Sequence, residues 1–404
     1  AASDVYKRQL ESSAGPSPSP RPWYRGRASK WLAYLVAFLL VFHIAGGWYF
    51  SGEIYSSALA PEASTSTLET PVLAVEGNTV TLSTIDGRDE LTIPGLWGLE
   101  WADGYGHLTE LIATGDDTAE WRFELIAGTA PTVGALTALD ERAFPGDPTQ
   151  AHGIAFSDVT YTSSLGENPA WFIDGSDPTW VVLVHGNGLT RRDVLKPLPA
   201  VVAAGHPALV ITYRNHPLAP ADPSGRLQYG LTEWEDLEAA VQYAVDEGAA
   251  DVVLVGYSMG AGIVANFLYE SSLADRVKGV VLDSPMLDFG ASVDLGASNR
   301  SLPVVGLPIP PTLTAMAKLI ASLRYDLDFG QLDYVDRVDE IVVPILLFHG
   351  VEDDLVPVAI GDELADTLPS LVEYHRVKSA KHPESWDLDR ELDEKALEEI
   401  LAGL

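Results

Sequence analysis

The sequence contains no cysteine among its 404 residues. This absence excludes a disulfide framework, a thiol nucleophile and any zinc or iron–sulfur site built on cysteine ligands. It does not identify the compartment, because a secreted protein can also do without disulfides. Any catalytic chemistry must therefore come from Ser, Thr, Asp, Glu, His or Lys side chains.

Basic residues are scarce, since 25 Lys and Arg stand against 58 Asp and Glu, a net charge of −33. Residues 1–30 hold six of the basic residues and carry a net charge of +4, so the chain after residue 50 carries −37. Such an acidic surface repels nucleic acid and anionic lipid headgroups. We therefore expect no nucleic-acid partner, and we expect the acidity to serve solubility rather than specific cation binding.

Formal charge is absent from residues 31–50, WLAYLVAFLLVFHIAGGWYF. Twenty such residues match a hydrocarbon core of about 30 Å, and the terminal Trp and Tyr residues lie where aromatic side chains meet membrane interfaces. We expect a retained transmembrane helix. The alternatives are a buried core helix and a signal peptide cleaved after Ala60, where the sequence reads Ala-Leu-Ala.

The positive charges predict the orientation of this helix. Four basic residues between positions 21 and 30 precede it, and no Lys or Arg follows before Arg88. Positive residues near a span stay on the cytoplasmic side. We therefore expect residues 1–30 to form a disordered basic tail in the cytoplasm, and the chain after the helix to lie on the extracytoplasmic side of the cell membrane.

Two further segments precede the largest domain. Residues 51–70 are small and polar, which predicts a linker. Residues 71–150 predict a small β-rich module, because apolar and polar residues alternate on both sides of Gly77-Asn78, the pattern of a hairpin, and a further strand is expected after it. The stretches GLWGLEW and AEWRFELIAG add strand-like segments. The module contains no catalytic constellation, and the sequence assigns it no role.

Residues 151–404 follow a different pattern. IAFSDVTYTSS and PAWFIDG predict an antiparallel pair of strands, and the apolar runs that follow are WVVLVHG, ALVITY, DVVLVGYS, GVVLDSP and VVPILLFHG. Such runs are typical of strands buried on both faces, and helical segments such as LTEWEDLEAAVQYAVDEG lie between them. The pattern predicts an α/β domain with a mostly parallel sheet flanked by helices. Catalytic groups collect at the carboxyl ends of such strands.

Ser258 lies at one of these strand ends, in GYSMG, and a helical segment follows it. The five-letter pattern Gly-x-Ser-x-Gly is weak evidence by itself, but its place between strand and helix predicts a strained turn that exposes a nucleophile. Gly256 and Gly260 would let the strand and the helix approach each other without Cβ clashes.

A serine nucleophile needs a base and an acid that orients the base. Three histidines follow Ser258: His349 and His375 lie within strand-like segments and are expected to be structural, whereas His382 lies in a loop and is our candidate base. The loop after VVPILLFHG presents three carboxylates as candidate acids, at positions 352, 353 and 354.

The turn HGNG at 185–188 supplies a fourth element. A tetrahedral intermediate carries an oxyanion that needs two preorganised donors. We expect one donor to be the N–H of Met259, directly after the nucleophile, and the other to be the N–H of Asn187.

Together these motifs give residues 154–404 a clear resemblance to the α/β-hydrolases. The matching stretches, in the order that the family shows, are HGNG (185–188), GYSMG (256–260), HGVEDDLVP (349–357) and AKHPESW (380–386). The family's Gly-x-x-Asp-x-x-Val-Pro turn, placed on GVEDDLVP, selects Asp353 as the acid, with Asp354 as the second choice. The pattern looks most like the membrane-anchored, serine-peptidase-like and lysophospholipase-like branch. The resemblance implies hydrolysis of an ester, thioester or amide without a metal or other cofactor.

The remaining expectations concern the substrate. The apolar, proline-rich stretch within 286–332 predicts a cap that admits apolar acyl groups, with Leu319 and Leu323 facing them; the alternative is plain packing against the sheet or the β-rich module. Arg214 is expected to be structural. We predict an anchored carboxylic ester hydrolase for small-molecule or lipid-like esters. The alternatives are a peptidase or acyltransferase on the same three residues and a non-catalytic anchored binding module.

Overall fold

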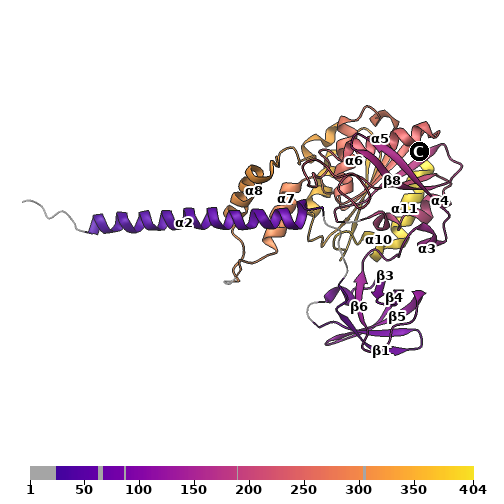
Figure 1. Ribbon diagram of the computed structural model, residues 1–404, viewed down its shortest axis with the longest axis horizontal. Helices are drawn as coiled ribbons and strands as arrows, with labels where there is room; N and C mark the ends of the chain where they lie inside the picture. Colours follow the sequence, from indigo (N-terminus) through magenta and orange to yellow (C-terminus); the bar gives the residue numbers. More distant parts are fainter. Residues whose placement is uncertain (1–23, 62–66, 86–87, 189, 304–305) are drawn as a thin grey trace, which may run out of the picture.

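A computed structural model describes residues 24–61, 67–85, 88–188, 190–303 and 306–404. Figure 1 shows three parts: a long projecting helix, a small β-barrel and a larger domain of sheet and helices. The tail predicted for residues 1–30 lies largely outside the described residues, and its last residues, from Tyr24 onward, already belong to the helix.

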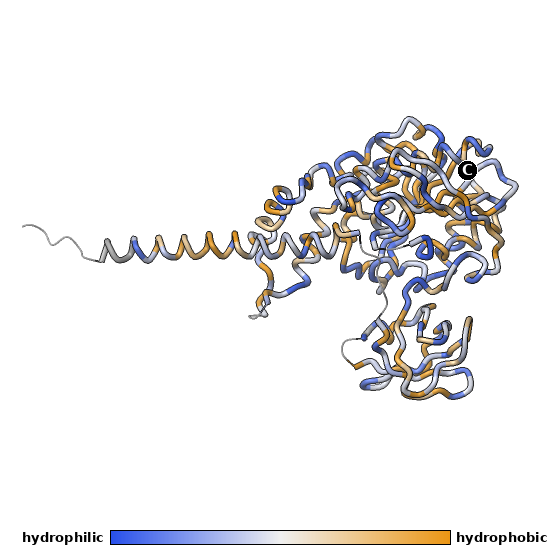
Figure 2. The backbone as a smooth tube through the Cα atoms, viewed as in Figure 1, coloured by the Kyte–Doolittle hydropathy of each residue, from blue (hydrophilic) through white to orange (hydrophobic). Residues whose placement is uncertain are grey.

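The projecting helix is α2, Tyr24–Ile54, and one π-helical turn, η1 (Tyr55–Leu59), continues it. It is longer than the predicted segment 31–50 at both ends. The predicted linker is corrected accordingly, because residues 51–59 are helical. Residues 31–41 are all exposed, which argues against the core-helix alternative. The helix is long and apolar enough to cross a membrane, and the projecting part is strongly hydrophobic (Figure 2).

The β-rich module is a closed antiparallel barrel with strand order β1-β2-β5-β4-β3-β6. Its strands are β1 Thr70–Glu76, β2 Thr79–Ser83, β3 Trp97–Trp101, β4 Gly104–Gly115, β5 Thr118–Gly128 and β6 Leu136–Asp140. The predicted hairpin around Gly77-Asn78 is present as β1 and β2. The strand expected directly after it is wrong, since Asp89–Thr92 forms a 3-10 turn (η2). Trp97 and Trp121 fill the barrel core, where both are fully buried.

The large domain is built on an eight-stranded sheet with order β14-β13-β12-β11-β9-β10-β8-β7. Its strands are β7 Ser157–Ser163, β8 Gly166–Ile173, β9 Thr179–Val184, β10 Ala208–Ile211, β11 Asp251–Tyr257, β12 Val277–Asp283, β13 Ile345–Gly350 and β14 Val372–Val377. The hairpin β7–β8 and the pair β8–β10 are antiparallel, and the other neighbouring pairs are parallel. The mostly parallel sheet predicted from the sequence is therefore present.

Helices cover both faces of this sheet, and an apolar core lies on each face. The central strands are buried on both sides, which explains their unbroken Val, Ile and Leu runs. The helices are α3 Pro148–His152, α4 Leu198–Ala203, α5 Trp234–Asp246, α6 Met259–Glu270, α7 Phe289–Ser298, α8 Pro311–Tyr325, α9 Val358–Thr367, α10 Ser385–Leu388 and α11 Arg390–Gly403. Short 3-10 turns are η3 Arg191–Val194, η4 Ala274–Arg276 and η5 Val335–Glu340. Helices α7 and α8 stand beside α2, away from the other helices (Figure 1).

Candidate active site

Ser258 occupies the sharp turn between β11 and α6. Its backbone angles, φ 52° and ψ −118°, fall in a region that residues with a Cβ rarely adopt. The flanking glycines explain how the turn fits. A Cβ on Gly256 would lie 2.8 Å from the Ala261 Cα atom, and one on Gly260 would lie 2.3 Å from the Val184 carbonyl oxygen. The predicted strained turn is therefore present, and both glycines are required by close backbone contact.

The His382 side chain reaches Ser258 from the loop between β14 and α10. Its Nε2 atom lies 2.8 Å from the Ser258 Oγ atom, and its Nδ1 atom lies 2.8 Å from the Asp353 Oδ2 atom. With the proton on Nδ1, the imidazole donates to Asp353 and can accept the Ser258 hydroxyl proton. Gly350 permits the approach of this loop, because a Cβ there would lie 2.3 Å from the Ala380 carbonyl oxygen.

Asp353 is the buried member of the three candidate acids, and Glu352 and Asp354 are exposed. Its Oδ1 atom accepts the N–H groups of Leu355 and Val356 at 2.9 and 2.7 Å. Burial raises the pKa of Asp353, but hydrogen bonds from His349, His382 and the Val356 N–H outweigh burial and hold the pKa well below its usual range. The structure thus brings Asp353, rather than Glu352 or Asp354, to His382 as a carboxylate.

His349 is closer to the site than its expected structural role implied. Its Nε2 atom lies 3.4 Å from Asp353 Oδ2 and 3.2 Å from the Val356 carbonyl oxygen. The sequence signal for this contact was the position of His349 at the end of β13, four residues before Asp353. His375 lies apart from the site, where its ring stacks on Phe348 with centroids 5.2 Å apart.

The two predicted oxyanion donors border Ser258. Met259 is the first residue of α6, so its N–H has no acceptor within the helix, and Asn187 follows β9. Within the described residues, neither N–H donates to another group of the chain. The Asn187 side chain donates to the Tyr229 hydroxyl at 2.8 Å and to the Ala58 carbonyl oxygen at 3.2 Å, and the Tyr229 hydroxyl donates to the same carbonyl at 3.0 Å. No motif in the sequence pointed to Ala58 or Tyr229 as residues of the site.

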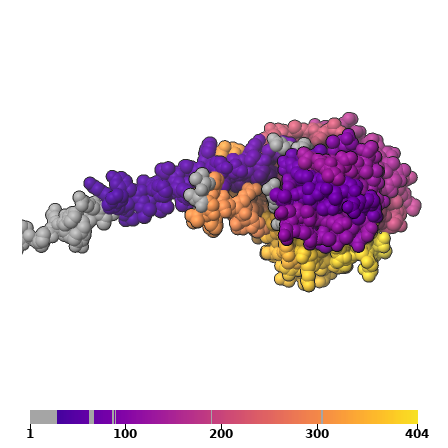
Figure 3. Space-filling model, turned by 90° about the horizontal axis from the view of Figure 1, so that it is seen from below, coloured from indigo at the N-terminus to yellow at the C-terminus, as the bar shows by residue number. Residues whose placement is uncertain are grey.

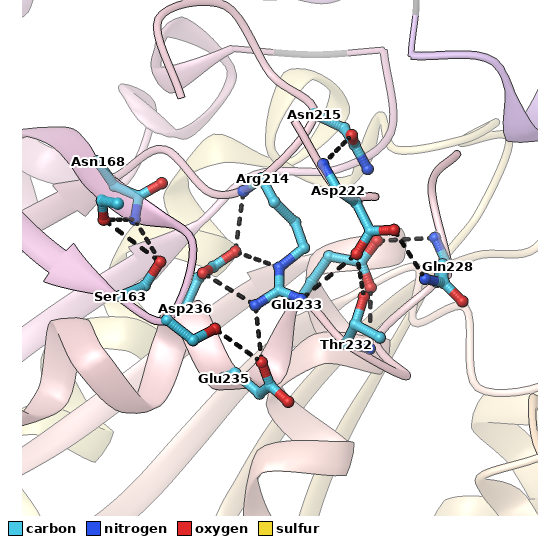
Figure 4. Close-up of polar contacts among 12 residues, drawn as sticks. Ser163, Asn168, Arg214, Asn215, Asp222, Gln228, Thr232, Glu233, Glu235 and Asp236 are labelled. Atoms are coloured by element: carbon cyan, nitrogen blue, oxygen red, sulfur yellow. Dashed lines mark hydrogen bonds and ion pairs between the residues drawn. The ribbon is translucent and has the colours of Figure 1, made fainter. Parts of the chain in front are cut away.

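Tyr229 belongs to a loop that a buried ionic network holds in place (Figure 4). The Arg214 guanidinium donates to both carboxylate oxygens of Asp236, at 2.7 and 3.1 Å, and also contacts Glu235 and Asp222. The Glu233 carboxylate accepts backbone N–H groups of the same loop, at Gln228 and Gly230. These contacts are those of a structural arginine, as expected for Arg214.

A cavity of about 730 Å³ lies over Ser258 and His382. Three parts of the chain form its wall: the end of α2, the region of α7 and α8, and the rest of the large domain with the barrel junction. Its lining residues are Phe50, Glu53, Ile54, Ser56, Ser57, Ala58 and Ala60 from the end of α2 and the turn after it, Met286, Phe289, Ser292, Val293, Gly296, Ala297, Arg300, Ile309, Thr314 and Ala317 from α7, α8 and their loops, and Glu141, Asn187, Gly188, Tyr229, Leu355 and Pro383 from the catalytic domain and the barrel junction. The expectation for Leu319 and Leu323 is wrong, because these side chains are 55% and 79% exposed on the outer face of α8.

The barrel contacts the segment that carries His382. The Lys381 Nζ atom lies 3.2 Å from Glu90 Oε1, and the Leu96 N–H donates to the Asp387 carbonyl oxygen. A second cavity, of about 380 Å³, lies between the barrel and the large domain, and charged side chains such as Arg142 and Lys196 line it. In the part of the chain that the structure describes, no group of three or more His, Asp or Glu residues is arranged to hold a metal ion.

Comparison with known proteins identifies similar sequences and folds. The model of the family described as "Alpha/beta hydrolase family" matches residues 181–394. The uncharacterized protein YqkD of Bacillus subtilis is 23% identical over 230 residues, which are 56% of this chain and 72% of that protein. The structure of the Pyrococcus furiosus esterase Pf2001 aligns with a TM-score of 0.51 at 21% identity, over 64% of this chain and 94% of that one. A second crystal form of this esterase gives 0.50 at 20% identity, over 64% and 96% of the two chains. The fold predicted for residues 151–404 is confirmed.

Proposed function

The chain belongs to the α/β-hydrolase family, and on that premise we propose that it is a membrane-anchored serine hydrolase of carboxylic esters. The observation that carries the proposal is the hydrogen-bonded series Ser258–His382–Asp353 at the floor of the 730 Å³ cavity. This is the arrangement of nucleophile, base and orienting acid that acyl transfer requires. The esterase fold of Pf2001 supports ester hydrolysis by analogy.

The residues take the following roles in the proposal. The Ser258 Oγ atom attacks the ester carbonyl carbon while its proton moves to the His382 Nε2 atom, and the N–H groups of Met259 and Asn187 stabilise the oxyanion. Collapse of the intermediate expels the alcohol, which takes the proton from His382, and leaves an acyl-serine. A water molecule then attacks the acyl carbon by the same route and releases the carboxylic acid. Asp353 keeps the imidazole in the productive tautomer throughout.

The cavity supports a medium-sized, partly apolar ester as substrate. Its volume is in the range that encloses a small organic ligand. Helix α7 and the loop before α8 contribute apolar lining such as Phe289, Val293 and Ile309. These features favour small-molecule or lipid-like acyl esters. They do not distinguish hydrolysis from transfer, so the experiment includes peptide amides, which a peptidase would cleave, and an added alcohol, which an acyltransferase would esterify.

The experiment combines a covalent probe with a substrate panel. A fluorophosphonate should label the purified full-length protein, and Ser258→Ala should abolish both the labelling and the hydrolysis of p-nitrophenyl esters. The substitution Ser284→Ala serves as the matched control, because Ser284 is also buried, but its hydroxyl has no hydrogen-bond partner among the described residues. Labelling that persists in Ser258→Ala would contradict the assignment of the nucleophile.

The anchoring and its orientation form the second part of the proposal. Residues 31–50 of α2 span the membrane, the N-terminus lies in the cytoplasm and the catalytic domain lies on the other side. Protease added to intact cells or spheroplasts should degrade the catalytic domain and spare an N-terminal tag. Protection of the domain until the membrane is permeabilised would reverse the orientation. Release of a domain that begins at Pro61 would favour the signal-peptide alternative.

A further inference from the structure

We propose that the segment 306–325, here called the cap segment, is seated in the membrane leaflet next to the large domain, alongside the anchor helix. The inference rests on the proposed membrane anchoring, but not on the proposed chemistry. The interacting partner is the lipid bilayer around the chain's own helix. The contacts between α8 and α2, the length of α2 that remains free and the composition of the cap segment support this position.

Helix α8 runs parallel to the second half of α2 and packs closely against it. The contacts begin at His43, whose Nε2 atom lies 3.0 Å from Thr312 Oγ1. They continue at Gly47, where a Cβ would lie 2.7 Å from Met316 Cγ. Farther along, the Arg324 guanidinium donates to the Trp48 carbonyl oxygen at 2.9 Å. The two helices therefore stay together over the last turns of the apolar segment of α2.

The free part of α2 is too short to cross a bilayer alone. The sequence places the last charged residue before the span at Lys30, and contact with α8 begins at His43. The twelve residues between them extend about 18 Å at a rise of 1.5 Å per residue. A hydrocarbon core is about 30 Å thick. If α2 spans the membrane, roughly 12 Å of that core must surround the region where α8 already lies against α2.

The composition of the cap segment suits this position. Between Asp294 and Asp326 the chain has no acidic residue and has three basic ones, although the chain after residue 50 carries −37. Leu307, Leu319 and Leu323 are 61%, 55% and 79% exposed, so large apolar side chains lie on the surface of the cap segment. Figure 3 shows this part of the chain, in orange, against α2.

Within the cap segment both basic residues, Lys318 and Arg324, follow the charge-free stretch 306–317, and Arg324 lies in the last turn of α8. The third basic residue, Arg300, precedes the segment. The Arg324 guanidinium stacks 4.0 Å from the centroid of the Trp48 ring, a pairing of cation and aromatic side chain that is typical of the headgroup level. Lys318 lies one and a half turns earlier and contacts Asp294 at 2.7 Å. Apolar side chains at the start of the cap segment and cations toward its end match the boundary between hydrocarbon and headgroups.

This position has a consequence for the substrate cavity. The inner face of the cap segment lines the cavity through Ile309, Thr314 and Ala317, and α2 lines it through Phe50 and Ile54. Part of the cavity wall is thus made by α2 and α8, the two helices placed in contact with lipid. An acyl ester from that leaflet would reach Ser258 along this wall without exposing its chain to bulk water.

The absence of cysteine allows a direct test in the full-length protein. Single-cysteine variants Leu307→Cys, Leu319→Cys and Leu323→Cys are labelled with a polarity-sensitive bimane and reconstituted into phosphatidylcholine vesicles. The control is Val342→Cys. Val342 is 81% exposed and precedes β13, so it lies at the amino ends of the parallel strands, whereas Ser258 lies at their carboxyl ends. Lipids with a nitroxide on the acyl chain should quench the three cap labels at least about twofold more than the Val342 label.

Equal quenching of the cap labels and the Val342 label would overturn the proposal. Flotation of the same vesicles in high salt is a separate readout for the anchor, because a chain held only by headgroup charge would be released. Protein that does not float refutes both the anchoring and this inference. Protein that floats with unquenched cap labels refutes the inference alone. Fluorophosphonate labelling of the same samples reports the chemistry and does not depend on either result.

Discussion

Ser258 combines a strained backbone conformation with a side chain held at hydrogen-bonding distance from His382. Its backbone is held at a positive φ by the packing of β11 against α6, and its Oγ atom lies within hydrogen-bonding distance of His382. A positive φ costs a residue with a Cβ about 1 kcal/mol or more. The surrounding contacts, with Gly256 and Gly260 at van der Waals limits, maintain it. The result is a hydroxyl that lines the cavity with the His382 imidazole already 2.8 Å away.

The choice among the acidic neighbours leads to a paired prediction. Asp353→Asn should lower kcat by about 10⁴-fold, because an asparagine amide favours the wrong tautomer of His382. Asp354→Asn removes the same charge from an exposed position and should change kcat by less than about twofold. Steady-state hydrolysis of a p-nitrophenyl ester measures both. If the larger loss were found in Asp354→Asn, the acid would have to be reassigned.

Tyr229 is predicted to position the oxyanion donor at Asn187. Tyr229→Phe removes a hydroxyl that accepts from the Asn187 side chain and donates to the Ala58 carbonyl oxygen. A hydrogen bond of this kind contributes about 1 kcal/mol, so kcat should fall by about fivefold to tenfold while KM changes little. Tyr243→Phe, on the partly buried side of α5, is the matched control. A fall in thermal stability without a change in kcat would indicate a purely structural role.

At the scale of elements, the end of α2 is part of the catalytic domain. Leu59 is fully buried in the same core as β9 and β11, and its carbonyl oxygen accepts the Leu227 N–H at 2.9 Å. The segment that links α2 to the large domain is therefore a structural component of the site rather than a tether. Cleavage after Ala60 would remove part of the cavity wall and the Ala58 carbonyl oxygen that accepts hydrogen bonds from Asn187 and Tyr229.

Two leucine substitutions test this integration. Leu59→Ala should lower the free energy of unfolding of the catalytic domain by about 2–5 kcal/mol, as expected for a fully buried leucine. Leu73→Ala, at a position 44% exposed in β1, should cost about 1 kcal/mol or less. Urea unfolding in detergent, followed by tryptophan fluorescence, measures both. Similar losses in the two variants would mean that the anchor end is not integrated into the core.

Helix α7 should determine the acyl length that the cavity accepts. Gly296 lines the cavity, and a Cβ built there meets no atom within 4 Å. Gly296→Phe should fill part of this space and lower kcat/KM for long acyl chains by about tenfold or more, with short chains largely unaffected. Gly296→Ala controls for helix propensity, and Leu323→Phe controls for bulk outside the cavity. A uniform loss over all chain lengths would argue against a role in selectivity.

At the scale of the whole molecule, buried carboxyl groups should make stability depend on pH. Burial raises the pKa of Asp387 to about 7, against a partial opposing effect of Lys196, and burial also raises the pKa values of Asp283 and Asp393. Between the ordinary Asp value of about 3.9 and these raised values, the folded state binds more protons than the unfolded state. The free energy of unfolding must then fall as pH rises through this interval. Self-repulsion of the acidic surface acts in the same direction.

The contribution of Asp353 to the pH dependence of stability has the opposite sign. Its lowered pKa stabilises the fold near neutrality, and this contribution is lost only when pH falls below the usual Asp range. We therefore expect the melting temperature to be higher at about pH 5 than at pH 8. Differential scanning fluorimetry at constant ionic strength measures this, and Asp387→Asn should reduce the slope. A melting temperature that rises from pH 5 to pH 8 would contradict the assignment.

The sequence by itself determined the parts of this protein that depend on neighbouring residues along the chain. Unbroken apolar runs identified the buried strands, and Gly256 and Gly260 identified the turn at Ser258, because close backbone contact there requires glycine. The order of motifs along the chain, together with the family pattern, selected Asp353 and His382. The strand expected after the Gly77-Asn78 hairpin was wrong, and β4 was missed, because pairing partners rather than local alternation decide the strands of a closed barrel.

Only the tertiary structure decided how distant segments meet at the site. The Asn187 side chain and the Ala58 carbonyl group are 129 positions apart in the chain, and no periodicity or motif encodes such a pair. In the same way, the apolar pattern of α8 could not tell which of its faces lines the cavity. Leu319 and Leu323 point outward because α2 and the catalytic domain already occupy the other faces of α8. Short stretches of sequence determine the strands and the turn that holds Ser258. The walls of the cavity, in contrast, depend on how α2, α7 and α8 pack against the large domain.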